Sequence, residues 1–219
     1  GDFDFTKNNN LTQMISIFAL SMIAVGFAAP GAMSHNIVIN AIGIFFAIFF
    51  ASVSILLILL KLILGFKNMF EHGVGLETAP SMWIIIPILT LLGITFVRVT
   101  FGLEHNFHTL TNKSSLFVLT SVILSLQIIF GVLGYSVMKK MGYFEKFIES
   151  NEKSAISFSL ICPGVAFFVF GMFFINLGLT YNGILEKYSF FYFILMIPFI
   201  YIQIKTIKLF FKLYKKFSF

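Results

Sequence analysis

Six stretches of this chain are apolar and long enough to cross a lipid bilayer. They span residues 11–29, 37–64, 81–102, 115–138, 155–179 and 189–209, with short polar loops between them. A helix needs about 20 apolar residues to cross the hydrocarbon core, and only helices or closed barrels satisfy their backbone polar groups there. The sequence therefore predicts an all-α integral membrane protein with six transmembrane helices, arranged as three antiparallel hairpins because the loops are short.

The composition excludes most other classes of protein. Hydrophobic residues make up 58% of the 219-residue chain and charged residues only 11%, whereas soluble proteins carry about 25% charged residues. The net charge of +6 could indicate nucleic acid binding, but the lysines lie at the ends of the apolar stretches, as in membrane proteins. We therefore expect the lipid bilayer as a partner, no nucleic acid, and a multi-pass location in the cell (inner) membrane.

The sequence lacks the common catalytic and cofactor motifs. It has no Walker A sequence, no dinucleotide-binding fingerprint and no nucleophile elbow. The single cysteine, Cys162, cannot form a disulfide or a cysteine-based metal site within one chain. We expect neither enzymatic activity nor a cofactor.

The distribution of basic residues predicts the orientation in the membrane. Twelve of the fifteen lysines and arginines lie on the side that holds both chain ends. Basic loops stay in the cytoplasm, so we expect residues 1–10 to be a cytoplasmic segment, 11–209 the membrane domain and 210–219 a basic, amphipathic cytoplasmic tail. Because residue 1 is a glycine in a polar stretch, we also expect further residues before it in the natural protein.

Two unusual residues, Pro87 and Arg98, interrupt the apolar stretch 81–102. Pro87 has no N–H to donate to the carbonyl of Trp83, so the helix should be kinked there. Arg98 is the only arginine in the chain, and a rotation of about 100° per residue returns it to nearly the face of Pro87. A charge on that face indicates contact with protein or water. Arg98 could attract anions at the outer mouth of a pathway, or simply extend to the membrane surface.

Small residues recur every seven positions in the stretch 155–179, at Ser157, Gly164, Gly171 and Gly178. Glycine in a helix costs about 1 kcal/mol relative to alanine, so this spacing needs a reason. It indicates either close packing of a neighbouring helix or a path for a solute. Pro163 should kink this helix as well. Phe167, Phe168 and Phe170 lie near two of the glycines, where a phenyl ring could close such a path.

Polar residues inside other apolar stretches predict contacts between helices. Gln127 is near the middle of the bilayer, where an unsatisfied amide costs several kcal/mol. It therefore needs a hydrogen-bond partner on another helix, with contact to a substrate as the alternative. A face of small and polar residues in 37–64 includes Asn40 and Gly43. Such faces let helices approach closely in lipid.

Three histidines and a glutamate form the one candidate metal site. His35 follows the first stretch, and Glu104, His105 and His108 follow the third, all on the side opposite the chain ends. His105 and His108 share a face if this segment is helical. The grouping is not the H-E-x-x-H zinc pattern, because the glutamate precedes the first histidine. Metal, haem or quinone binding is one interpretation, and polar loop histidines without a ligand are the other.

The segments TAPSMWIIIPILTLLG and SLICPGVAFFVFG each place a proline within an apolar helix. They resemble the tellurite-resistance/dicarboxylate transporter family, which includes the plant slow anion channels. Members of that family have ten helices as five hairpins around a central pore, usually in a trimer. The resemblance implies that this chain forms the last three hairpins of a homotrimeric pore protein, with two hairpins before Gly1. It also implies that Phe167, Phe168 or Phe170 closes the pore.

We therefore expect a transporter or channel for small anions. In this hypothesis Arg98 supplies positive potential, the kinks at Pro87 and Pro163 open space, and a phenylalanine forms the gate. A membrane redox subunit that uses the candidate histidines is one alternative. A partner that only scaffolds a larger complex is another.

A reporter fused after Phe219 tests the predicted orientation. A reporter enzyme that is active only outside the cytoplasm should remain inactive there, because most of the basic residues lie on that side. The same reporter placed in the loop after His108 should be active. Activity at Phe219 would overturn the assignment of spans.

Overall fold

The structure is a computed structural model that describes residues 11–110 and 112–218. In chain order its elements, with η for 3-10 and π-helices, are η2 (Thr12–Met14), α1 (Ile15–Met33), α2 (Ile37–His72), η3 (Ala79–Trp83), α3 (Ile85–Phe107), α4 (Lys113–Lys140), η4 (Phe144–Glu149), η5 (Ala155–Leu160), α5 (Ile161–Phe173), η6 (Phe174–Thr180) and α6 (Phe190–Phe217). These elements form six spans that are long and apolar enough to cross a membrane. The expected number of spans is therefore confirmed in the described part of the chain, and the expectation for residues 1–10 lies outside it.

The second span shows how local sequence sets the ends of a helix. Asn36 caps α2, because its Oδ1 accepts hydrogen bonds from the N–H groups of Val38 and Ile39, at 2.9 and 3.3 Å. The helix runs for 36 residues and stops at Gly73, whose φ is 74°. Its length of about 54 Å exceeds the hydrocarbon core of about 30 Å. It continues past residue 64, the predicted end of the span, because nothing before Gly73 stops it.

The third and fifth spans are each interrupted just before a proline. The third begins as the 3-10 helix η3 and becomes α-helical at Ile85, shortly before Pro87. The fifth begins as the 3-10 helix η5 and becomes α-helical at Ile161, shortly before Pro163. A proline lacks the N–H that would bond four residues back, so a regular α-helix does not extend through the preceding turn. The interruptions expected near Pro87 and Pro163 are thus changes from a 3-10 helix to an α-helix.

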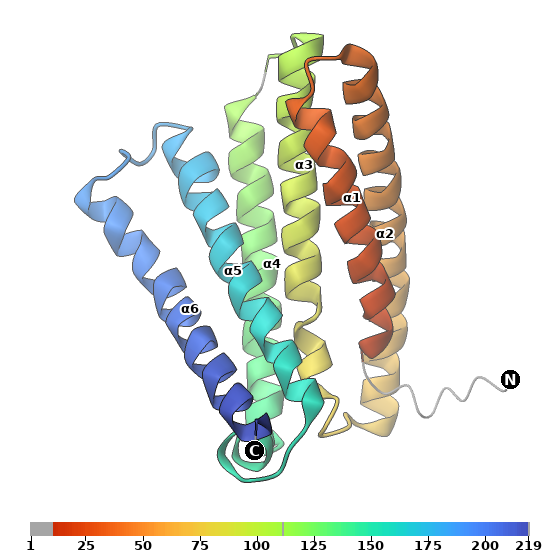
Figure 1. The fold of residues 1–219 in the computed structure, drawn as a ribbon, viewed down its shortest axis with the longest axis vertical. Helices are drawn as coiled ribbons and strands as arrows, with labels where there is room; N and C mark the ends of the chain where they lie inside the picture. Colours follow the sequence, from red (N-terminus) through yellow and green to blue (C-terminus); the bar gives the residue numbers. More distant parts are fainter. Residues whose placement is uncertain (1–10, 111, 219) are drawn as a thin grey trace, which may run out of the picture.

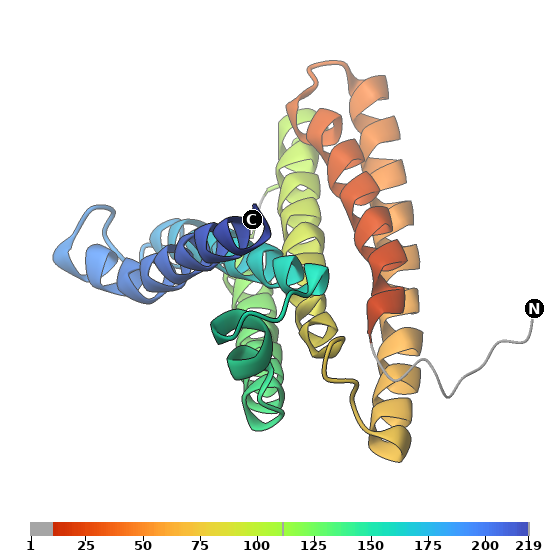
Figure 2. The same ribbon diagram turned by 60° about the horizontal axis from the view of Figure 1, so that its bottom comes forward.

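The helix α3 lies at the centre of the bundle (Figure 1). It packs against α1 and α2 on one side and against α4 and α5 on the other. The last helix, α6, packs chiefly on α5, and Figure 2 shows this pair standing away from α1 and α2. We call the end of the bundle where the C-terminus lies the terminus side and the other end the far side. Helices α4 and α6 approach each other on the terminus side and diverge toward the far side (Figure 1).

Glycines bring α1, α2 and α3 into close contact toward the far side. A Cβ added at Gly102 of α3 would overlap the carbonyl oxygen of Gly31 of α1, and one added at Gly43 of α2 would lie 2.7 Å from the Gly31 nitrogen. Asn40 joins all three helices, because its side-chain amide donates to the carbonyls of Gly31 and Gly102. The small-residue face of α2 is therefore a face of close helix contact.

The connection between α4 and α5 forms a packed cap on the terminus side. Tyr143 is fully buried, and its hydroxyl lies 2.8 Å from the Oγ of Ser157. Phe147 and Ile148 of η4 are buried in the same cluster as Leu213 of α6. Burial raises the pKa of Tyr143 and outweighs the opposing effect of the Ser157 hydrogen bond. The phenol therefore stays protonated at neutral pH, and the cap ties together the ends of α4, α5 and α6.

The variant Gly102→Ala tests the contact between α1 and α3. The added methyl would overlap a backbone carbonyl, which cannot rotate away as a side chain can. We expect a loss of about 1–3 kcal/mol in the free energy of unfolding, measured as a lower midpoint of thermal unfolding in detergent. Gly26→Ala is the matched control, because nothing lies within 4 Å of a Cβ at that position. Equal midpoints for the two variants would contradict the close approach of α1 and α3.

Candidate functional site

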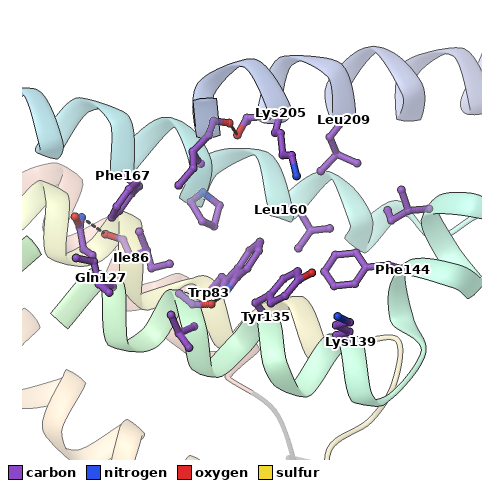
Figure 3. A pocket seen from close by; sticks show the side chains of 18 of the residues that line it. Trp83, Ile86, Gln127, Tyr135, Lys139, Phe144, Leu160, Phe167, Lys205 and Leu209 are labelled. Carbon is purple, nitrogen blue, oxygen red and sulfur yellow. Dashed lines mark hydrogen bonds between the residues drawn. The ribbon is translucent and has the colours of Figure 1, made fainter. Parts of the chain in front are cut away.

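A cleft of about 780 Å³ lies between α4 and α6 on the terminus side (Figure 3). Residues of η3, α3, η5 and α5 form its floor, and residues of η4 line its end. Most of its wall is apolar and includes Ile86, Leu160, Phe167 and Leu209. The volume is within the range of about 300–1,000 Å³ that is usual for small-molecule sites.

Four charged side chains line the mouth of the cleft. Lys139 lies in the last turn of α4 and Lys205 lies on α6, so the two cations come from opposite walls. Glu145 and Glu149 come from η4, beyond the end of α4. All four residues are exposed, and neither lysine forms an ion pair with another residue of the described chain. The mouth therefore offers two cationic and two anionic groups to an occupant.

Gln127 of α4 lies at the inner end of the cleft and is fully buried. Its Nε2 donates to the hydroxyl of Thr90 at 2.7 Å. It also donates to the carbonyl of Ile86 at 3.2 Å, the bond that Figure 3 draws. The Thr90 hydroxyl lies 3.2 Å from the carbonyl oxygen of Ala166 on α5. The hydrogen bonds between helices that the sequence predicts for Gln127 are thus present, and they join α3, α4 and α5. Its Oε1 has no partner among the described residues.

Trp83, the only tryptophan in the chain, forms part of the cleft floor. Its indole Nε1 donates to the carbonyl of Gly131 on α4 at 3.0 Å. Its ring also fills the space beside Gly134, where an added Cβ would lie 2.5 Å from the indole. The indole is therefore held against α4, and its ring borders the cleft (Figure 3).

Three of the residues predicted to form a pathway line this cleft, namely Pro163, Gly164 and Phe167. The ring of Phe167 is only partly buried, and its centroid lies 5.2 Å from that of Phe199 on α6. Phe167 extends from the floor near Gln127, as Figure 3 shows. Of the three candidate gate residues, it is the one placed where a ring can alter the shape of the cleft. Its role as a gate stays a prediction.

The other candidates on the fifth span lie in helix contacts outside the lining of the cleft. Phe170 is fully buried, and its ring fills the space beside Gly93 of α3. Phe168 packs in an apolar cluster with residues of α4 and α6. A Cβ at Gly171 would overlap the ring of Phe199. Close packing thus accounts for the position of Gly171.

Arg98 and Pro87 also lie outside the lining of the cleft. The Nη1 of Arg98 donates to the carbonyl oxygen of Val25 on α1 at 3.0 Å, and the residue is half-buried between α3 and α1. Pro87 is buried in the first turn of α3, next to Ile86, which does line the cleft. Their predicted roles in attracting anions and opening space stay predictions.

On the far side, the structure brings His35 and His105 together. The Nδ1 of His35 lies 3.1 Å from the Nε2 of His105, and both residues are exposed. His108 ends α3 in a left-handed conformation with φ of 51°, and Glu104 lies in the last turns of the same helix. Within residues 11–110 and 112–218, no group of three or more histidine, cysteine, aspartate or glutamate residues could hold a metal ion.

Sequence reasoning missed the residues that define the cleft. Lys139 entered only into the prediction of orientation, and Lys205 also as one of the basic residues at the cytoplasmic end of the last helix. Trp83 entered only as a helix residue before Pro87. A lone tryptophan beside a proline break is a weak signal for a cavity. The two lysines are far apart in sequence, and their common site depends on how α4 and α6 flank α5.

The pair Gly164→Ala and Thr206→Ala tests how α5 meets α6. A Cβ at Gly164 would overlap the Thr206 hydroxyl, so Gly164→Ala alone should lower the midpoint of thermal unfolding in detergent. Adding Thr206→Ala removes the overlapping hydroxyl and methyl and should restore part of the loss, by about 0.5–3 kcal/mol of coupling. Gly131→Ala is the control, because only Ile86 Cδ1 lies within 4 Å, at 3.9 Å. Strictly additive effects of the two alanine substitutions would contradict this contact.

Comparisons with known proteins do not assign the chain to a family. No protein-family model, no curated protein and no solved structure matches it significantly. The resemblance to the tellurite-resistance/dicarboxylate transporter family therefore stays a prediction. The six apolar spans are consistent with a multi-pass membrane protein.

Proposed function

We propose that this membrane protein transports a small anion, and that the anion enters the cleft between α4 and α6 from the terminus side. The observation that supports the proposal is the pair Lys139 and Lys205, which come from opposite walls of a largely apolar cleft. Cationic groups at the mouth of a cleft with apolar walls raise the local concentration of anions. The distribution of basic residues predicts that this side is cytoplasmic.

The two glutamates at the mouth oppose this attraction. Glu145 and Glu149 are exposed on η4, beyond the end of α4, where water and salt screen a charge within about 8–10 Å. Lys205 lies within the membrane-spanning helix α6, next to Thr206, which meets Gly164 on the cleft floor. Lys205 is exposed like the other three charged residues, and its position beside the cleft floor makes it the cation that an anion in the cleft would meet in this proposal.

In this proposal Phe167 is the gate. Its ring stands between the mouth of the cleft and Gln127 at the inner end (Figure 3). A phenyl ring needs no hydrogen-bond partner, and it can move between staggered rotamers. The change from the 3-10 helix η5 to α5 lies just before Pro163, within two turns of Phe167. Such a change of helix type often marks a functional hinge.

The proposal also includes a larger pore assembly and a role for Arg98. Three antiparallel hairpins would form the last part of a ten-helix pore, assembled as a homotrimer, and Arg98 would supply positive potential on the far side. The guanidinium already donates to an α1 carbonyl. If it also attracts anions, Arg98→Ala should lower flux, while Arg98→Lys should retain part of it.

Phe167→Ala tests the gate. Removing the ring opens the inner end of the cleft, so basal flux of chloride or nitrate into liposomes should rise well above that of the unmodified protein. Phe170→Ala is the matched control, because its ring is buried against α3 outside the cleft lining. That change should cost about 3–5 kcal/mol of stability without a leak. Phe168→Ala should not leak either. If all three variants are folded and none leaks, the proposed gate is wrong.

The contact between His35 and His105 favours one second candidate, a redox subunit that binds a metal, haem or quinone. Two imidazole nitrogens 3.1 Å apart could both reach one metal ion. The optical spectrum of the purified protein separates the candidates. A Soret band would favour the redox function, and a featureless visible spectrum would count against haem.

A further inference from the structure

We propose that a phospholipid with a primary ammonium headgroup, from the leaflet on the terminus side, binds in the cleft between α4 and α6. One acyl chain would lie along the apolar floor toward Phe167, with the headgroup among the four charged residues of the mouth. This inference goes beyond the proposed transport function and does not depend on it. A chain that transports nothing could still bind this lipid.

The walls of the cleft are continuous with the lipid-facing surface of α4. Ile128 and Val132 line the cleft and are also 48% and 62% exposed. An acyl chain can therefore enter sideways from the bilayer between α4 and α6. Water gains too few hydrogen bonds along apolar walls to fill such a space, whereas an acyl chain makes dispersion contacts with them. In a membrane, lipid acyl chains are the most abundant apolar groups around a protein.

The charged residues of the cleft lie away from its inner end at Gln127 and Phe167, so the lining has a charged part and an apolar part, as a lipid has. Lys139 and Lys205 can donate to a phosphate, and the carboxylates of Glu145 and Glu149 can accept hydrogen bonds from an ammonium group. Neither lysine is already paired with a carboxylate of the described chain. Two cationic and two anionic groups together match a zwitterionic headgroup better than an anionic one.

The single tryptophan makes this proposal directly testable. Trp83 lies on the floor of the cleft, so all tryptophan emission comes from this site. Phospholipids with brominated acyl chains quench tryptophan on contact. The full chain would be reconstituted in phosphatidylcholine bilayers with increasing fractions of brominated phosphatidylethanolamine, phosphatidylcholine or phosphatidylglycerol.

We expect brominated phosphatidylethanolamine to quench Trp83 at lower fractions than the other two lipids. Phosphatidylcholine carries a quaternary ammonium without N–H groups, and phosphatidylglycerol carries no ammonium, so both lack donors for the glutamates. Equal quenching by all three lipids would mean that Trp83 only meets bulk lipid, and would overturn the proposal. Absence of quenching by any lipid would mean that protein fills the cleft, and would overturn it as well.

Matched pairs of lysine variants test the role of the headgroup contacts. Lys139→Ala with Lys205→Ala should raise the fraction of phosphatidylethanolamine needed for half-quenching by about fivefold per lysine. Lys140→Ala with Lys208→Ala removes the same charge from the same two helices outside the cleft lining and should leave that fraction unchanged. Equal shifts in the two pairs would show that only the general surface charge matters, which contradicts the proposed site. An unchanged emission spectrum without brominated lipid confirms that each variant keeps Trp83 in place.

Discussion

The hydrogen bonds around the start of α3 join it to α4 and α5. Pro87 removes the N–H that would bond to the carbonyl of Trp83, and side chains around this turn bond to neighbouring helices. The Gln127 amide donates to Ile86 and Thr90, and the Trp83 indole donates to Gly131. In a bilayer, where water cannot replace such bonds, each lost partner is costly. This cluster therefore fixes α4 against the break in α3 and forms the inner end of the cleft.

The cleft itself follows from the way α6 is attached. Gly164 and Gly171 let α6 lie directly on α5, which is the helix that α6 contacts most. The packed cap around Tyr143 joins the ends of both helices on the terminus side. α4 and α6 thus stand on opposite sides of α5 and leave a space between them, lined on the α4 side by exposed apolar residues. Both proposed occupants, a small anion and a lipid headgroup, use Lys139 and Lys205.

Hydropathy alone predicted the six spans, because the cost of exposing backbone in lipid leaves few alternatives. The breaks near Pro87 and Pro163 were also foreseeable, since the missing N–H acts locally. The cleft was not foreseeable from the sequence. It depends on the placement of α4 and α6 around α5, and no short-range sequence pattern determines that placement. The seven-residue spacing of glycines was open to two interpretations in the sequence. The contacts with Thr206 and Phe199 account for it by packing at Gly164 and Gly171.

In the proposed function, the cleft between α4 and α6 admits an anion from the terminus side. A cysteine at Gly131, where an added Cβ meets only Ile86, tests it in a Cys162→Ser background with a membrane-impermeant, sulfonate-bearing thiol reagent. Gly131→Cys should react from the terminus side and react more slowly when chloride or nitrate is added. Ile129→Cys, on the exposed face of α4 outside the lining, should not react. Equal rates of thiol reaction at Gly131→Cys and Ile129→Cys, or no reaction at Gly131→Cys, would contradict the entry of an anion into the cleft.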